Sequence, residues 1–217
     1  MARSRPAPGG GITVEVGIDR VPGWINRFAG RNSGVLTIEA TPHLVALRAG
    51  DGTTAELAVP FGPMNIGDRE PIEALIAHLS GIGAVGIVAV RAGAHSVGIA
   101  RAGVVVASKT DRPYVQGRTA AGGWSQQRYA RRRGNQLTAS LDDAATATVR
   151  VLGPMISSLD ALVLGGDITA LRTVLDDSRL AALKSLPQRE FRDIPEPRRS
   201  VIDDLAERLY AVEITVR

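Results

Sequence analysis

The sequence predicts an α/β protein with a mixed β-sheet, an antiparallel meander, flanking helices and a small β-rich N-terminal part. Three β runs follow one another closely at 85–91, 96–101 and 103–109, and turn residues such as Ala102-Gly103 join them, which is typical of a meander. A helical pattern follows from about residue 125, and strands and helices then alternate up to the C-terminus. A run of strands that is followed by alternating strands and helices indicates one mixed sheet with helices packed on it.

The N-terminal part reads as strands with two helices. Residues 1–10 carry Pro and Gly with little apolar content, so we expect a disordered tail there. We predict strands at 12–16, 34–39, 44–47 and 55–59, and helices at 21–28 and 70–80. The expected organisation is a tail at 1–10, a β-rich part at 11–66 packed on the main domain, and a main domain at 67–217.

The C-terminal half is predicted from apolar spacing. Leu137, Leu141, Ala145, Thr148 and Leu152 recur every three or four residues, which predicts a helix from about Ser125 to Gly153-Pro154. Beyond it we expect a buried strand at 159–164, a helix at 168–175, a polar connection from 190, a helix at 197–208 and a closing strand at 212–216.

The composition excludes several classes of site. The 217 residues include no cysteine and only three scattered histidines, so a disulfide, a thiolate metal site or a zinc site is not expected. The longest apolar runs are far shorter than a bilayer span, and the first ten residues have no apolar signal core. We therefore expect a cytoplasmic protein with no membrane partner, no metal and no cofactor, and a monomer.

Positive charge is concentrated in one segment. Residues 101–133 hold eight basic residues and one acid, a net charge of +7, which leaves −3 on the rest of a chain whose total is +4. A basic patch on a near-neutral body favours a polyanion such as nucleic acid as partner. The alternative is that the arginines reflect coding bias and only solvate a loop. The basic residues are Arg101, Lys109, Arg112, Arg118, Arg128, Arg131, Arg132 and Arg133.

The segment Gly122-Gly-Trp-Ser-Gln-Gln127 is the strongest candidate for chemistry. Gly122 and Gly123 have no side chain, so this backbone can enter a narrow cleft and adopt conformations closed to other residues. Ser125 is a plausible N-cap. That placement puts Gln126 and Gln127 in the first helical turn, where free N–H groups favour a phosphate or a developing negative charge.

The helix after this segment has a predicted arginine face. With about 100° per residue and Leu137 at the centre of the buried stripe, Gln126 falls near that stripe, whereas Arg128, Arg131 and Arg132 gather on the opposite side. Like charges four residues apart repel each other, which favours a phosphate-binding face. An ordinary solvated face of a long helix is the alternative.

These residues resemble a known family. Gly-Gly-Trp-Ser-Gln-Gln-Arg-Tyr-Ala-Arg-Arg-Arg133 is similar to the Gly-Gly-Gln loop and following helix of archaeal and eukaryotic class I release factors, and more closely to the Vms-like release factors. The meander, Val163-Leu-Gly-Gly-Asp167 and the Pro195-Glu-Pro-Arg-Arg-Ser-Val segment extend the resemblance over roughly residues 83–217. It implies the ribonuclease-H-like topology of the release factors' middle domain, but it does not explain the first 80 residues.

The resemblance also implies an activity. This is hydrolysis of the ester between a nascent peptide and tRNA in the peptidyl transferase centre of the large ribosomal subunit, without codon reading, on stalled ribosomes or large subunits. It implies Gly122, Gly123 and a catalytic glutamine as site residues, with peptidyl-tRNA and rRNA as partners. The RNA-binding residues would be Lys109, Arg112, Arg118, Arg128, Arg131, Arg132 and Arg133.

The sequence departs from the family at the catalytic position. In an ungapped register Trp124 stands where the release factors have their glutamine, whereas one inserted residue aligns the Ser-Gln of Vms-like proteins with Ser125 and Gln126. We favour Gln126 and keep Gln127 open. The competing function is a ribosome- or RNA-binding module without catalysis.

Other motifs are weaker. Gly81-Ile-Gly-Ala-Val-Gly86 has dinucleotide-binding spacing but precedes a strand, so a close-packed turn is expected. His43, His78 and His95 lack partner carboxylates at metal spacing, and His78 is expected to be a packing or rim residue. Trp24 and Phe28, which could stack on RNA, are expected in the core.

Overall fold

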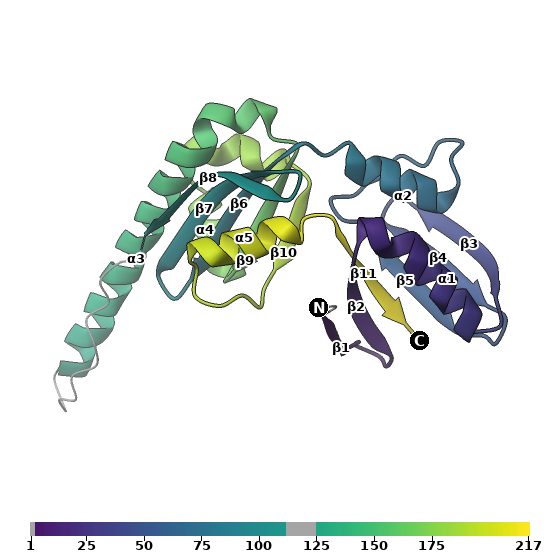
Figure 1. The fold of residues 1–217 in the computed structure, drawn as a ribbon. Coiled ribbons are helices and arrows are strands. Elements are labelled where there is room, and N and C mark those ends of the chain that lie inside the picture. The colour runs from purple at the N-terminus through teal and green to yellow at the C-terminus, as the bar shows by residue number, and fades with distance from the viewer. Residues whose placement is uncertain (1–2, 112–124) are drawn as a thin grey trace. The chain divides into compact units, whose positions relative to one another are not determined.

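The computed structural model of the chain describes residues 3–111 and 125–217, and for residues 125–135 it describes the backbone alone. The chain divides into two compact units (Figure 1). The first unit comprises Met1–Gly83 and Arg208–Arg217, and the second comprises Ala84–Glu207. This division differs from the expected boundary between residues 66 and 67, because a helix and the C-terminal strand belong to the first unit.

The first unit is an antiparallel sheet in the order β1-β2-β11-β5-β4-β3, accompanied by two helices. α1 contacts β2, and α2 contacts β3. Pro22 stands in the first turn of α1, where its missing N–H costs nothing. The elements are β1 (Ser4–Pro6), β2 (Ile12–Gly17), α1 (Val21–Arg31), β3 (Val35–Thr41), β4 (Leu44–Ala49), β5 (Thr54–Ala58), α2 (Pro71–Ser80) and β11 (Ala211–Val216), with a 3-10 turn at Ile18–Arg20.

The β-rich N-terminal part is therefore confirmed, but its limits are not those expected. The tail is not disordered throughout: β1 pairs with β2, from Ser4 opposite Val14 to Pro6 opposite Ile12. α2 buries Leu75 and Leu79, and the His78 ring forms a hydrogen bond with the carbonyl oxygen of Pro60 at 3.0 Å, as a packing residue would.

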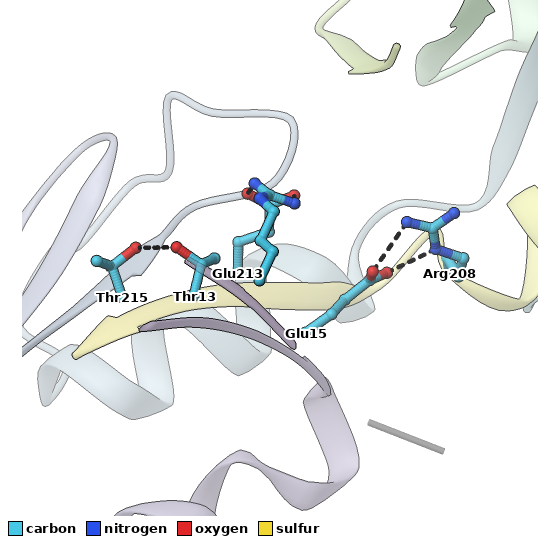
Figure 2. Close-up of polar contacts among 6 residues, drawn as sticks. Thr13, Glu15, Arg208, Glu213 and Thr215 are labelled. Carbon is cyan, nitrogen blue, oxygen red and sulfur yellow. Dashed lines mark hydrogen bonds and ion pairs between the residues drawn. The ribbon is translucent and has the colours of Figure 1, made fainter. Parts of the chain in front are cut away.

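The closing strand β11 lies between β2 and β5, both of which come from the N-terminal part of the chain (Figure 1). Three polar contacts accompany this pairing (Figure 2). Thr13 and Thr215 share a hydrogen bond of 3.0 Å, Arg208 donates to both carboxylate oxygens of Glu15 at 2.8 and 2.9 Å, and Arg5 pairs with Glu213 at 2.8 Å. A long-range partner of this kind cannot be read from local sequence.

The second unit is a mixed sheet in the order β10-β9-β6-β7-β8. β6, β7 and β8 form the predicted antiparallel meander, and β9 and β10 continue the sheet in parallel with β6. The predicted mixed sheet with flanking helices is confirmed. The elements are β6 (Ala84–Arg91), β7 (Ala94–Arg101), β8 (Val104–Asp111), α3 (Ser125–Leu152), β9 (Ala161–Gly166), α4 (Ile168–Leu175), β10 (Gln188–Phe191) and α5 (Arg199–Glu207), with 3-10 turns at Gly153–Ser158 and Ser178–Ser185.

Helices cover both faces of this sheet (Figure 1). A Cβ added at Gly86 would meet Leu152 of α3 at 3.1 Å, so the backbone packs tightly against that helix, although Gly86 lies within strand β6 rather than in the expected turn. On the other face, a Cβ added at Gly98 of β7 would lie 2.7 Å from Ile202 of α5. The three layers enclose a core that is fully buried at β6 and β9.

Two predictions for the second unit were wrong. The polar connection expected from 190 begins with strand β10 at Gln188–Phe191, which pairs in parallel with β9 at the edge of the sheet. Leu137, taken as the centre of the buried stripe of α3, is 50% exposed. Among the residues of α3 whose side chains are described, Ser140 is the first buried one, and Ala144 and Thr148 continue the buried face.

Candidate functional site

The predicted catalytic segment lies between β8 and α3 in the second unit. β8 ends at Asp111 and α3 begins at Ser125. Gly122, Gly123, Arg112 and Arg118 fall outside the described residues. The predicted start of the helix is confirmed.

The first turns of α3 carry the predicted glutamines and arginines. Gln126 and Gln127 are the second and third helical residues, and Ser125 is the first, one place further into the helix than the cap position expected for it. Arg128, Arg131, Arg132 and Arg133 all fall within the first nine residues of the helix, with no acid among them. The structure describes only the backbone of these residues, so the roles of their side chains stay predictions.

Lys109, the remaining predicted RNA contact, is described in full and has a partner. Its Nζ lies 2.8 Å from the Asp111 carboxylate, and the side chain is 36% exposed. Residues two apart in a strand point to the same face, which is why these two side chains meet. The hydrogen bond from Lys109 is the main reason that the pKa of Asp111 lies below its ordinary value.

A bulge in the meander brings Asp111 opposite His95. The β7–β8 hairpin turns at Ala102-Gly103, and both residues have positive φ, as a two-residue turn requires. Arg101 pairs with Val104, but the register shifts by one residue between Ile99 and Ala100, so His95 pairs with Asp111 and Ser96 with Thr110. Without the extra residue, His95 would face Thr110.

His95 is buried without a hydrogen bond. Its side chain is 1% exposed, and neither ring nitrogen has a hydrogen-bond partner among the described residues. Nε2 lies 3.8 Å from Asp111 Oδ2. Burial lowers the pKa of His95 below 6.5, and the carboxylates of Asp111 and Asp143 only partly oppose that effect. The ring is therefore neutral at pH 7 and offers one donor and one acceptor.

This histidine lines one hollow, and a second hollow shares two of that hollow's lining residues. One, of about 370 Å³, is lined by His95, Asp111, Asp143 and Thr146 together with Lys109 and Arg150. The other, of about 420 Å³, is lined by Ala107, Ser108 and Val151 with the same Lys109 and Arg150. Both are formed by the β8 edge of the sheet and the packed half of α3. No carboxylate among the described residues lies within ion-pair distance of Arg150.

Sequence reasoning missed His95 and Asp111 as neighbours. The alternation of the two strands placed both on the sheet, but only the bulge determines which residue faces which. Phe28 lies in the core as predicted, at 5% exposed, whereas Trp24, also expected there, is only half-buried; the two rings stack at 5.3 Å between centroids.

Across residues 3–111 and 125–217, no three His, Asp or Glu side chains stand close enough to hold a metal ion. Among the described helices, none combines the length and the apolar character needed to cross a bilayer.

Comparisons with known proteins identify the family of this chain. The family model described as the Actinobacteria/chloroflexi VLRF1 release factor matches residues 83–215, more than half of the chain. Among solved structures, the archaeal translation termination factor aRF1 is similar with a TM-score of 0.37 and 12% identity, over 91% of this chain and 66% of that one. This chain thus spans slightly less than two thirds of that factor. No curated protein matches. The chain therefore belongs to the VLRF1 release factor family of Actinobacteria and Chloroflexi, and so to the proteins of translation.

Proposed function

We propose that the protein is a codon-independent peptidyl-tRNA hydrolase that releases nascent peptides from stalled ribosomes or large ribosomal subunits in the cytoplasm. The observation that carries this proposal is the start of α3 at Ser125, because it puts Gln126 and Gln127 in the first helical turn, three and four positions after Gly123. Family membership over residues 83–215 supports the same function.

The chemistry follows from position rather than from proton transfer. A glutamine amide has no pKa near neutrality, so it orients a water molecule by hydrogen bonding instead of deprotonating it. The first turn of a helix also presents free N–H groups, which stabilise negative charge on the leaving oxygen. A positioned donor of this kind lowers the activation free energy by about 2.7–4 kcal/mol, which raises the reaction rate roughly a hundred- to a thousandfold.

The RNA-binding part of the proposal rests on charge. Four arginines in the first nine residues of α3 would contact rRNA or tRNA phosphates, with Arg112, Arg118 and Lys109 beside them. Lys109 would have to share its charge between a phosphate and Asp111. We propose the large subunit, its peptidyl transferase centre and peptidyl-tRNA as partners, and a monomeric protein.

The test is peptide release from large subunits loaded with peptidyl-tRNA. We expect Gln126→Ala to reduce release at least a hundredfold without loss of folding. Gln136→Ala is the matched control, because Gln136 is an exposed glutamine of the same helix. Loss of release in Gln127→Ala alone would move the catalytic position by one residue, and full release in both variants would refute the mechanism.

A second test addresses the arginine face. Replacing Arg128, Arg131 and Arg132 together by Gln should weaken binding to large subunits and reduce the slope of log affinity against log salt by roughly 0.9 for each lost phosphate contact. An unchanged slope would remove these arginines from the interface.

A ribosome-binding module without catalysis is the second candidate. The observation that favours it is Trp124, which occupies the position of the release factors' glutamine in an ungapped register. This function predicts tight binding to large subunits together with an intact ester after long incubation.

A further inference from the structure

The His95 ring is chemically incomplete in the free protein. A neutral imidazole carries one donor and one acceptor, and neither is satisfied here although the side chain is 1% exposed. Leaving such groups without a partner costs about 1–3 kcal/mol each, so a buried ring of this kind calls for an explanation. The ring is among the groups that line a hollow of about 370 Å³.

The lining of that hollow suits a strongly polar ligand. Among the side chains that line it, Asp111 and Asp143 carry carboxylates, Thr146 carries a hydroxyl, and Lys109 and Arg150 carry positive charge. Asp111 and Asp143 would repel a lone anion, but they accept hydrogen bonds from the N–H groups of a base edge. Lys109 and Arg150 supply the charge for a phosphate on the same ligand.

The two cations also line the neighbouring hollow. Lys109 and Arg150 border both the 370 Å³ hollow and the 420 Å³ one, and the second adds the apolar side chains of Ala107 and Val151. A ligand that fills both hollows has its negative charge in the middle and a polar or flat group on each side. A phosphodiester between two nucleosides has this order of groups.

We propose that the two hollows bind two consecutive nucleotides of single-stranded RNA, with the phosphate that joins them at Arg150 and Lys109 and one base edge at His95. The choice of RNA rests on the proposed ribosomal function, but the site is separate from the Gly-Gly loop in its residues. The guanidinium of Arg150 is the principal phosphate contact, because Lys109 already pairs with Asp111 at 2.8 Å.

The experiment follows the three histidines by NMR while RNA is added. His43 is exposed and His78 is half-buried in the first unit, so both serve as internal references for His95. The ligands are a single-stranded RNA hexanucleotide of mixed sequence, adenosine monophosphate and inorganic phosphate. We expect the hexanucleotide to shift the His95 ring signals at saturation, with the other two histidines unchanged.

A pair of arginine variants tests the phosphate contact. Arg150→Gln should weaken RNA binding and lower the slope of log affinity against log salt by about 0.7, the value for one contact to a single strand. Arg172→Gln is the matched control, because Arg172 is an exposed arginine on α4 of the same unit, and it should change neither quantity.

Each remaining outcome has a defined meaning. The proposed site would be overturned by any of three results: no RNA binding, RNA binding without a shift of the His95 signals, or equal effects of the two arginine variants. Equal shifts from the mononucleotide or from phosphate at the same concentration would reduce it to a free nucleotide or anion site and overturn the two-nucleotide claim. A protein that binds RNA in this way but releases no peptide would refute the hydrolase proposal alone.

Discussion

The ion pair between Glu15 and Arg208 should be the strongest polar contact that fastens the C-terminal strand to the first unit. Its two hydrogen bonds are 2.8 and 2.9 Å long, and the side chains are only 10% and 16% exposed. The exposed pair Glu56–Arg217 offers a comparison on the same sheet: it is 2.6 Å long, but its side chains are 44% and 40% exposed. If distance alone determined the strength of an ion pair, Glu56–Arg217 would be the stronger of the two.

Solvent screening determines the expected magnitudes. Two unit charges 4 Å apart interact by about 4 kcal/mol near a protein surface and by about 1 kcal/mol in water. After the cost of desolvation, we expect a coupling free energy of about 2 kcal/mol for Glu15–Arg208 and less than about 1 kcal/mol for Glu56–Arg217. Arg208→Met alone should cost about 3 kcal/mol, because it leaves the Glu15 carboxylate nearly buried without its cation.

The assay is a pair of double-mutant cycles. Glu15→Gln with Arg208→Met and Glu56→Gln with Arg217→Met would be compared by urea unfolding at pH 7. The chain has two tryptophans, so a Trp124→Phe background leaves Trp24 of α1 to report on the first unit alone. Equal coupling in the two cycles, or a Glu15–Arg208 coupling below about 0.5 kcal/mol, would refute the reasoning.

Three further predictions concern the second unit. Gly166→Ala should destabilise this unit by about 2 kcal/mol, because Gly166 has φ +100° and a Cβ there would collide with a carbonyl oxygen of β6. Gly153→Ala is the control, since a Cβ at Gly153 has room. Thermal unfolding compares the stabilities of the two variants. Because burial lowers the pKa of His95 below 6.5, the unfolded chain takes up the proton first, so stability should fall as the pH drops below about 6.5, by at most about 1.4 kcal/mol per pH unit. Urea unfolding at several pH values checks this, and His95→Gln should flatten the dependence. Hydrogen bonds from Arg179 lower the pKa of Asp177 to about 2, and Arg179→Gln should return it toward 3.8 in an NMR titration; an unchanged value would contradict that cause.

Local patterns predicted most of the second unit. The meander, the start of α3 and the helix at α5 follow from apolar spacing and turn residues, which act over a few positions. β10 was missed because Gln188–Phe191 is polar and becomes a strand only by pairing with β9. β1 was missed for the same reason, since its Pro and Gly neighbours resemble a free tail.

The candidate site shows the same limit at the scale of single residues. Gln126 and Gln127 were placed correctly in the first turn of α3 from sequence, because a helix start is a local feature. The pairing of His95 with Asp111 depends on one extra residue in β8, and no local signal specifies where an edge strand bulges. The distribution of α5 and α3 on opposite faces of the sheet likewise depends on the complete fold.

The length of α3 has a consequence for access. The helix begins at Ser125, fifteen positions before Ser140, which is the first buried residue among those of α3 whose side chains are described. Figure 1 shows the first half of the helix extending beyond the sheet. At 1.5 Å per residue, these fifteen positions give a reach of roughly 22 Å from the packed body. A single helix is about 10–12 Å wide, far narrower than the three-layered unit behind it. A passage too tight for that unit would still admit this helix.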